Sequence, residues 1–154
     1  MASPAQPIQG VTLSRTMPPA LPAHFLTRSH LFPLIDNAVS GSTLVIAPAG
    51  YGKSSLVAEW AQQSVRKVIW LTISGSDALQ DMSSLFVQAT RNAIPGFGKW
   101  FEENQPMRPT DVVRMWSNEL LALGGEYVFV LDNLRDESKG DVEIEHKLIE
   151  QFPS

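Results

Sequence analysis

A nine-residue stretch rich in glycine and hydroxyl side chains is the part of this chain best suited to chemistry. The residues Ala47-Pro-Ala-Gly-Tyr-Gly-Lys-Ser-Ser55 follow the pattern G-x-x-x-x-G-K-[ST], except that alanine stands at the first position. A glycine at that place eases a turn, whereas Gly52 lets backbone amides close around an anion, so alanine is the milder departure. The spacing therefore predicts a loop that binds phosphate groups.

The residue types in this loop each suit one part of a bound nucleotide. Gly50 and Gly52 leave room for a close approach of the backbone, and the amides from Lys53 onward face an anion at a helix N-terminus. The Lys53 ammonium reaches the outer phosphates, and the Ser54 hydroxyl is placed to ligate Mg²⁺. We therefore expect ATP or ADP with Mg²⁺ as cofactors, bound by Ala49, Gly50, Tyr51, Gly52, Lys53, Ser54 and Ser55. The alternative is a chance match in an ordinary turn. The strand expected before the loop and the helix expected after it argue against that alternative.

A carboxylate that could complete a magnesium site follows an apolar run later in the chain. Asp132 comes directly after Tyr127-Val-Phe-Val-Leu131, which is where P-loop proteins place the acid that holds Mg²⁺, usually through water. We predict Asp132 as a metal ligand and, together with Lys53, as a catalytic residue. Many such ATPases have a second acid where this chain has Asn133, so two interpretations stay open: weakened hydrolysis, or an ordinary turn.

A second Gly-x-Gly-Lys run provides an internal comparison. Gly96-Phe-Gly-Lys-Trp100 has the same spacing, but no apolar strand precedes it and no hydroxyl follows Lys99, which predicts a solvated loop. The histidines lack metal-ligand spacing and are expected at the surface: His24, His30 and His146. Three tryptophans on apolar faces are expected to anchor the core: Trp60, Trp70 and Trp116.

The elements that must position these residues can be read from apolar periodicity. Continuous apolar runs predict strands at Thr43–Ala47, Val68–Ile73 and Tyr127–Leu131. Helical spacing predicts helices at Thr27–Val39, Lys53–Val65, Met82–Ala93 and Thr110–Leu123. Their expected end signals are Pro33 in a first turn, Asp81 and Thr110 as N-caps, and Gly124 as a stop. Strands alternating with amphipathic helices argue for an α/β domain with a mainly parallel sheet, which binds ligands beyond the carboxyl ends of its strands.

The remaining segments set the expected domain limits. Five prolines among small polar residues predict an extended arm over residues 1–22, and residues 23–154 are expected to form the nucleotide-binding domain. Residues 96–109 show no period and are expected to be a loop. Residues 142–152 have a weakly helical pattern.

Composition limits the classes of function that this chain can have. Its 154 residues include 44% hydrophobic side chains, enough for one sizeable core, and no cysteine, which excludes disulfides and thiolate metal sites. A net charge of −4 gives no basic surface for polyanions, so direct DNA binding by this segment is not expected. The chain starts without a secretion signal and has no apolar run of about 20 residues, so we expect a cytoplasmic protein without membrane contact.

Several segments together resemble one known family. They are Leu13-Ser-Arg-Thr-Met-Pro-Pro-Ala-Leu-Pro-Ala-His-Phe-Leu-Thr-Arg28, Leu31 with Leu34-Ile-Asp36, the loop Ala47–Ser55 with Trp60, Val68-Ile-Trp-Leu71 with Asp77, and Val130-Leu-Asp132. From about Leu13 to Asp132 the chain resembles the N-terminal ATPase of MalT-like, LuxR-type transcriptional regulators, which are AAA+/STAND-like P-loop NTPases. Alanine at the first loop position is usual in that family.

The resemblance implies a switch domain that exchanges ADP for ATP and assembles into oligomers, which present a distant DNA-binding module. It also places Arg28 near the nucleotide. In this class a later strand inserts between the metal-binding strand and the P-loop strand, so the chain is expected to be an incomplete fragment; a naturally short protein is the alternative. The expected partners are the nucleotide, further copies of the chain and other domains of the parent protein.

Two other functions could use the same loop. A catalytic P-loop enzyme such as a small-molecule kinase would need an arginine-rich lid or acceptor site. The arginines after the loop are instead scattered, at Arg66, Arg91, Arg108, Arg114 and Arg135. A structural interaction domain with a vestigial loop is the third possibility, and nucleotide titration separates it from the other two.

Overall fold

The computed structural model describes residues 7–37, 41–74 and 79–133, and the chain divides into two compact units. The sheet unit comprises the residues up to Met17 and those from Arg66 onward. The loop unit is Pro18–Val65 and contains the glycine loop.

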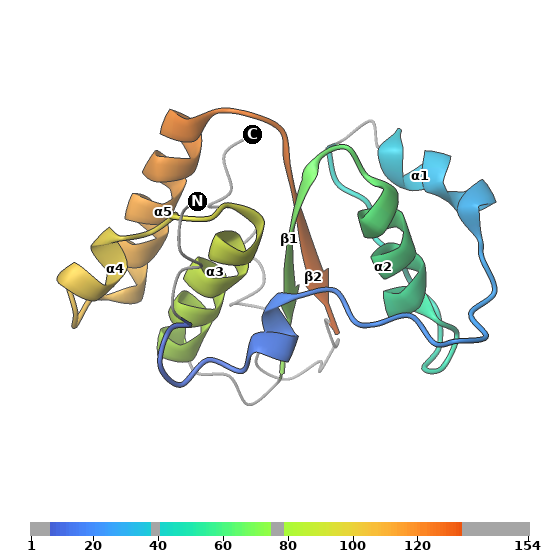
Figure 1. Cartoon of the computed structure of the whole chain (residues 1–154), viewed down its shortest axis with the longest axis horizontal. Coiled ribbons are helices and arrows are strands. Elements are labelled where there is room, and N and C mark those ends of the chain that lie inside the picture. Colours follow the sequence, from blue (N-terminus) through green and yellow to red (C-terminus); the bar gives the residue numbers. More distant parts are fainter. Residues whose placement is uncertain (1–6, 38–40, 75–78, 134–154) are drawn as a thin grey trace. The chain divides into compact units, whose positions relative to one another are not determined.

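The sheet unit is built on two parallel strands joined by a helical crossover (Figure 1). β1 (Lys67–Thr72) pairs with β2 (Tyr127–Asp132), and the register sets Thr72 opposite Asp132. The strands predicted at 68–73 and 127–131 are thus confirmed to within one residue. The described residues form a mixed α/β fold in which helices flank a small parallel sheet, as the alternating pattern predicted.

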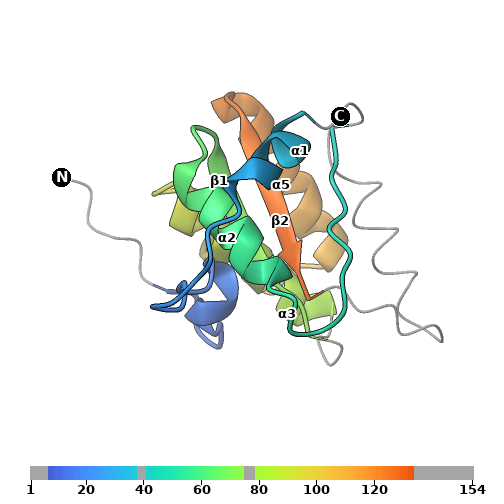
Figure 2. The same cartoon turned by 90° about the vertical axis from the view of Figure 1, so that its right-hand side faces the viewer.

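The third predicted strand, Thr43–Ala47, is wrong. These residues form neither strand nor helix, and their trace runs towards α2 without an arrow (Figure 2). Leu44 and Ile46 are 74% and 81% exposed, whereas a strand covered on both faces would bury them. A strand exists only with a hydrogen-bonded partner, and among the described residues only β1 and β2 pair. The sheet predicted as mainly parallel is therefore a two-stranded parallel sheet in the part of the chain that the structure describes.

Three helices connect β1 to β2 along the chain: α3 (Leu79–Ala93), α4 (Trp100–Glu103) and α5 (Pro109–Leu123). α3 begins earlier than predicted, so Asp81 lies inside the helix and is not its N-cap. α4 lies where the sequence predicted an irregular loop. A single turn of helix such as α4 leaves no periodic signal, so the sequence pattern could not predict it.

The limits of α5 show which end signals were informative. The helix begins at Pro109 with Arg108 as its N-cap, because proline suits the first helical position. Thr110 therefore lies in the first turn and is not the cap that we predicted. Gly124 ends the helix as predicted, with a φ of +60°.

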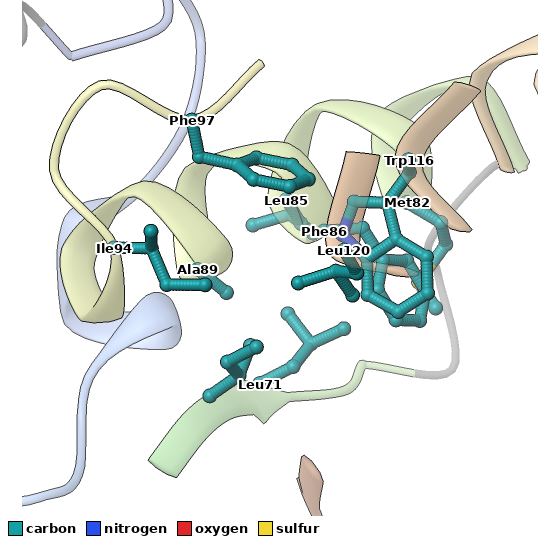
Figure 3. Packing of buried hydrophobic residues seen from close by; sticks show 10 residues of the cluster. Leu71, Met82, Leu85, Phe86, Ala89, Ile94, Phe97, Trp116 and Leu120 are labelled. Atoms are coloured by element: carbon teal, nitrogen blue, oxygen red, sulfur yellow. The ribbon is translucent and has the colours of Figure 1, made fainter. Parts of the chain in front are cut away.

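The core of the sheet unit lies between β1, α3 and α5 (Figure 3). Its buried side chains are Ile69, Leu71, Met82, Leu85, Phe86, Ala89, Ile94, Phe97, Trp116 and Leu120. Trp116 packs edge-on against Phe86 and Phe129, with ring centroids 5.9 and 5.0 Å away. Its indole N–H donates to the Thr90 hydroxyl over 2.8 Å, which satisfies the polar end of a buried ring. Trp70 is also buried, so both tryptophans anchor this unit as predicted.

Part of the predicted extended arm is folded onto the sheet unit. Leu13–Thr16 forms a 3-10 helix, η1, that buries Thr16. Arg15 donates from Nε and Nη2 to the Thr72 carbonyl at the end of β1, over 3.1 and 2.9 Å. Asn92 on α3 donates to the carbonyl and hydroxyl oxygens of Thr16. These long-range polar contacts hold residues 13–16 in place, and a count of prolines cannot predict them.

The loop unit places the glycine loop directly before its longest helix. η2 (Ser29–Leu31) leads into α1 (Phe32–Asp36), and α2 spans Lys53–Gln63. Pro33 lies in the first turn of α1 as predicted, but α1 is shorter than the helix predicted over 27–39, of which residues 38–40 fall outside the described residues. α2 begins at Lys53 as predicted and buries Trp60, whose indole N–H donates to Asp36 over 3.0 Å.

Four further predictions concern the helix end, the surface and the last residues of the chain. Val65 was predicted on the apolar face of α2, but it lies beyond the helix and is fully exposed. His24 and His30 are exposed as predicted. His146 and the helix predicted over 142–152 lie outside the described residues.

Along the described chain, no helix has both the length and the apolar content needed to cross a membrane.

Candidate phosphate-binding site

Two glycines give the candidate loop its shape. Gly50 and Gly52 have φ values of +82° and +70°, in the left-handed region where residues with a Cβ are strained. Between them, the Tyr51 N–H donates to the Pro48 carbonyl over 3.4 Å and closes a turn. The Gly-x-Gly spacing is therefore explained by the backbone conformation of this loop.

α2 begins immediately after the second glycine and so brings backbone N–H groups to the loop. Gly52 is the N-cap, and the first bond into the helix runs from the Leu56 N–H to the Gly52 carbonyl over 3.0 Å. The N–H groups of a first helical turn precede that bond, and an α-helix itself provides no acceptor for them. Together with the helix dipole, such a start favours an anion.

The Lys53 ammonium lies over the first turn of the loop. Its Nζ donates to the carbonyl of Ala47 over 2.7 Å and to that of Pro48 over 3.1 Å. An ammonium has three N–H donors, of which the described residues accept two. A phosphate oxygen could take the third while the other two keep the side chain folded against the loop.

Arg28 contacts the loop through its guanidinium. Nη1 donates to the Tyr51 carbonyl over 3.1 Å, and Nη2 donates to the Gly52 carbonyl over 2.5 Å. The backbone N–H of Arg28 donates to the Glu59 carboxylate on α2 over 3.3 Å, and the Phe25 ring lies 5.9 Å from the guanidinium carbon. The structure thus places Arg28 at the loop, where its bonds go to backbone carbonyls.

The other predicted phosphate ligands lie on either side of Lys53. Ala49 and Tyr51 are exposed, and Ser54 and Ser55 are half-buried in the first turn of α2. The loop unit therefore brings together Arg28 and the whole predicted stretch from Ala49 to Ser55.

Asp132 ends β2 in the sheet unit. Its carbonyl accepts the Ile73 N–H over 2.9 Å, which extends the pairing of the two strands. Asn133 follows with a φ of +63°, and its Nδ2 donates to the Ile73 carbonyl over 2.8 Å. Asparagine tolerates this left-handed conformation better than most residues, so Asn133 has a structural part at the strand end. Asp132 and the glycine loop belong to different units.

The second Gly-x-Gly-Lys run is packed into the sheet unit, so the prediction of a solvated loop is wrong. Phe97 is buried, and the Gly98 N–H donates to both oxygens of the Glu119 carboxylate over 3.2 and 3.0 Å. Arg91 donates to the Gly98 carbonyl over 2.6 Å and forms an ion pair with Glu102. A carboxylate of the protein already occupies this amide, so the run serves packing.

Two acids that sequence reasoning missed organise these loops. Glu59 is only 5% exposed in the middle of α2 and accepts the Arg28 N–H. Glu119 on α5 accepts the Gly98 N–H and the Trp100 indole N–H. A carboxylate that is buried, as in Glu59, or half-buried, as in Glu119, must find donors, so an acid on the apolar face of a helix was the signal that could have found both.

Comparison with models of protein families, with curated proteins and with solved structures gives no match to this chain.

Proposed function

We propose that this chain binds the phosphates of Mg-ATP or Mg-ADP through residues 49–55 and acts as an ATP-dependent switch in a signalling or transcriptional regulator. The observation that supports nucleotide binding most directly is the order of the parts. A loop bent by two left-handed glycines leads into a helix N-terminus, and an ammonium lies over the loop. Each part favours a compact anion with several charges, such as a nucleotide phosphate.

Typical free energies indicate how much each part of the site would contribute to nucleotide affinity. An affinity of about 1 µM corresponds to about 8 kcal/mol. A hydrogen bond to a charged group contributes about 1.5–3 kcal/mol, and the helix dipole about 0.3–1 kcal/mol. The Lys53 ammonium alone is therefore insufficient, and several amides at the start of α2 must contribute.

The Ser54 hydroxyl in the loop unit is a hard donor of the kind that Mg²⁺ prefers, and Mg²⁺ keeps several waters and takes few protein ligands. The Asp132 carboxylate, predicted from the sequence as a second ligand, is also a hard donor and belongs to the other unit. When bound, the ion would neutralise charge on the β- and γ-phosphates.

The regulatory part of the proposal rests on the family resemblance of the sequence. It makes other domains of a parent protein and further copies of this chain the expected partners, in the cytoplasm. The net charge of −4 argues against direct contact of this segment with DNA. DNA binding would then belong to another module of the parent protein.

Calorimetric titration with Mg-ADP and with Mg-ATP tests the proposal. Lys53→Ala should weaken binding by about 10- to 100-fold, because it removes a charge-assisted bond to the phosphates. Lys99→Ala is the matched control, since Lys99 is the exposed lysine of the other Gly-x-Gly-Lys run. It should bind as the wild type does.

The outcomes separate the three functions considered for this loop. Equal binding by the wild type and Lys53→Ala would remove the assignment of the phosphates to this loop. Failure of the wild type to bind either nucleotide would favour a structural interaction domain. Transfer of phosphate from ATP to a small acceptor would favour a kinase over a switch.

A further inference from the structure

The guanidinium of Arg28 bridges two consecutive carbonyls of the glycine loop, those of Tyr51 and Gly52. We propose that Arg28 is a positioning residue that clamps these carbonyls and thereby sets the direction of the loop amides. The effect on nucleotide affinity rests on the proposed function. The effect on the loop itself does not.

The planarity of the peptide bond links the clamp to the phosphate site. In a trans peptide the C=O of one residue points opposite to the N–H of the next. Holding the Tyr51 carbonyl towards Arg28 therefore turns the Gly52 N–H to the other side, and holding the Gly52 carbonyl does the same for the Lys53 N–H. A phosphate would bind on this amide side, while Arg28 acts on the carbonyl side.

Arg28 is itself held in place within the loop unit. Its backbone N–H donates to the carboxylate of Glu59, which is buried in α2, and the Phe25 ring contacts its guanidinium. The clamp therefore joins the segment before α1 to both the glycine loop and α2. A planar guanidinium can bridge two carbonyls with a fixed geometry, whereas a lysine ammonium is a point charge on a flexible stem.

The clamp also adds a steric reason for glycine at position 52. A Cβ there would lie 2.8 Å from Arg28 Nη2, whereas a Cβ at Gly50 would meet nothing within 4 Å. Both glycines have a left-handed φ, so alanine is strained at either position. Only at 52 would it also collide with Arg28. Because the colliding atom ends a flexible side chain, alanine would push the guanidinium off its carbonyls.

A double-mutant cycle uses this difference. Gly52→Ala and Gly50→Ala are each made in the wild type and in Arg28→Ala, and hydrogen exchange of the Leu56 N–H is measured without nucleotide. That N–H is bonded to the Gly52 carbonyl and so reports on the clamped peptide. We expect Gly52→Ala to lower Leu56 protection about tenfold more than Gly50→Ala does, and this excess to vanish in Arg28→Ala. Equal losses at the two glycines in both backgrounds would overturn the clamp.

Arg28→Lys keeps the positive charge but removes the planar guanidinium, so it separates the effect of geometry from that of charge. It also adds no side chain to the loop. It should lower Leu56 protection nearly as much as Arg28→Ala; full protection in Arg28→Lys would overturn the clamp. Titration of the same variants with Mg-ADP tests the link to function, and affinity should fall in parallel with protection. If the wild type binds no nucleotide, the proposed function fails while the exchange data still decide the clamp. If Mg-ADP binds but protection shows no coupling between 28 and 52, the clamp alone fails.

Discussion

Replacing Asn133 by aspartate should weaken the sheet unit, because the asparagine amide holds the chain just beyond β1. Its Nδ2 donates to the Ile73 carbonyl over 2.8 Å, and its backbone is left-handed. Aspartate tolerates this backbone but cannot donate, and its charge would face a carbonyl oxygen. The loss of one exposed hydrogen bond costs about 0.5–1.5 kcal/mol, so we expect about 1 kcal/mol or slightly more with the added repulsion.

Asn133→Gly is the matched control, because glycine keeps the left-handed φ without strain and also lacks the donor. In urea unfolding followed by tryptophan fluorescence, the midpoint urea concentration should be highest for the wild type, lower for the glycine variant and lowest for the aspartate variant. The buried Trp70 and Trp116 report on the sheet unit. An aspartate variant that unfolds at the wild-type urea concentration would refute the stabilising part given to the amide.

The same substitution decides between the two interpretations of Asn133 in hydrolysis. An amide can bond a water but cannot accept its proton, and general-base help is worth about 10²- to 10⁴-fold. If ATP is bound as proposed, single-turnover hydrolysis should be slow, and Asn133→Asp should accelerate it. Fast hydrolysis that the substitution leaves unchanged would make Asn133 a turn residue only.

Three further predictions concern the sheet unit. The Arg91 guanidinium lowers the pKa of Glu102 below its ordinary 4.5. This pair should stabilise the fold above that pH and lose its effect as the pH falls through the lower folded pKa, so the acid-side drop in melting temperature should be smaller in Glu102→Gln. Glu119→Gln should destabilise by about 1–3 kcal/mol, because the Gly98 N–H and the Trp100 indole N–H both donate to that carboxylate; an unchanged melting midpoint would count against this. Within the described residues the sheet has only two strands, and open strand edges recruit partners, so sedimentation should show self-association with rising concentration; a monomer throughout would contradict it.

Local signals in the sequence predicted α2 and β2. Gly52 followed by Lys53 marked the start of α2, and the apolar run before Asp132 marked β2, because each depends on residues within a few positions. The run at Thr43–Ala47 shows the limit of such signals. Its residues are mostly apolar and β-branched, which favours a strand, but strand pairing also depends on a partner elsewhere in the chain.

Contacts made through the backbone explain what sequence reasoning could not supply. Arg28 was placed near the site only by the family resemblance, and its bonds go to carbonyls that every residue possesses. Gly96–Trp100 was predicted to be solvated because no apolar strand precedes it, but its partners, Arg91 and Glu119, lie on two separate helices. Such contacts become visible only when the fold brings distant residues together.

Amide chemical shifts of the ¹⁵N-labelled chain during titration with Mg-ADP test the central claim most directly, because they locate the bound phosphates. The proposed site predicts that the largest changes occur at the amides of Gly50 to Ser55, which form the loop and the first turn of α2. Lys53→Ala should reduce these changes at the same nucleotide concentration. Saturable binding that leaves the amides of 50–55 unchanged would contradict the account.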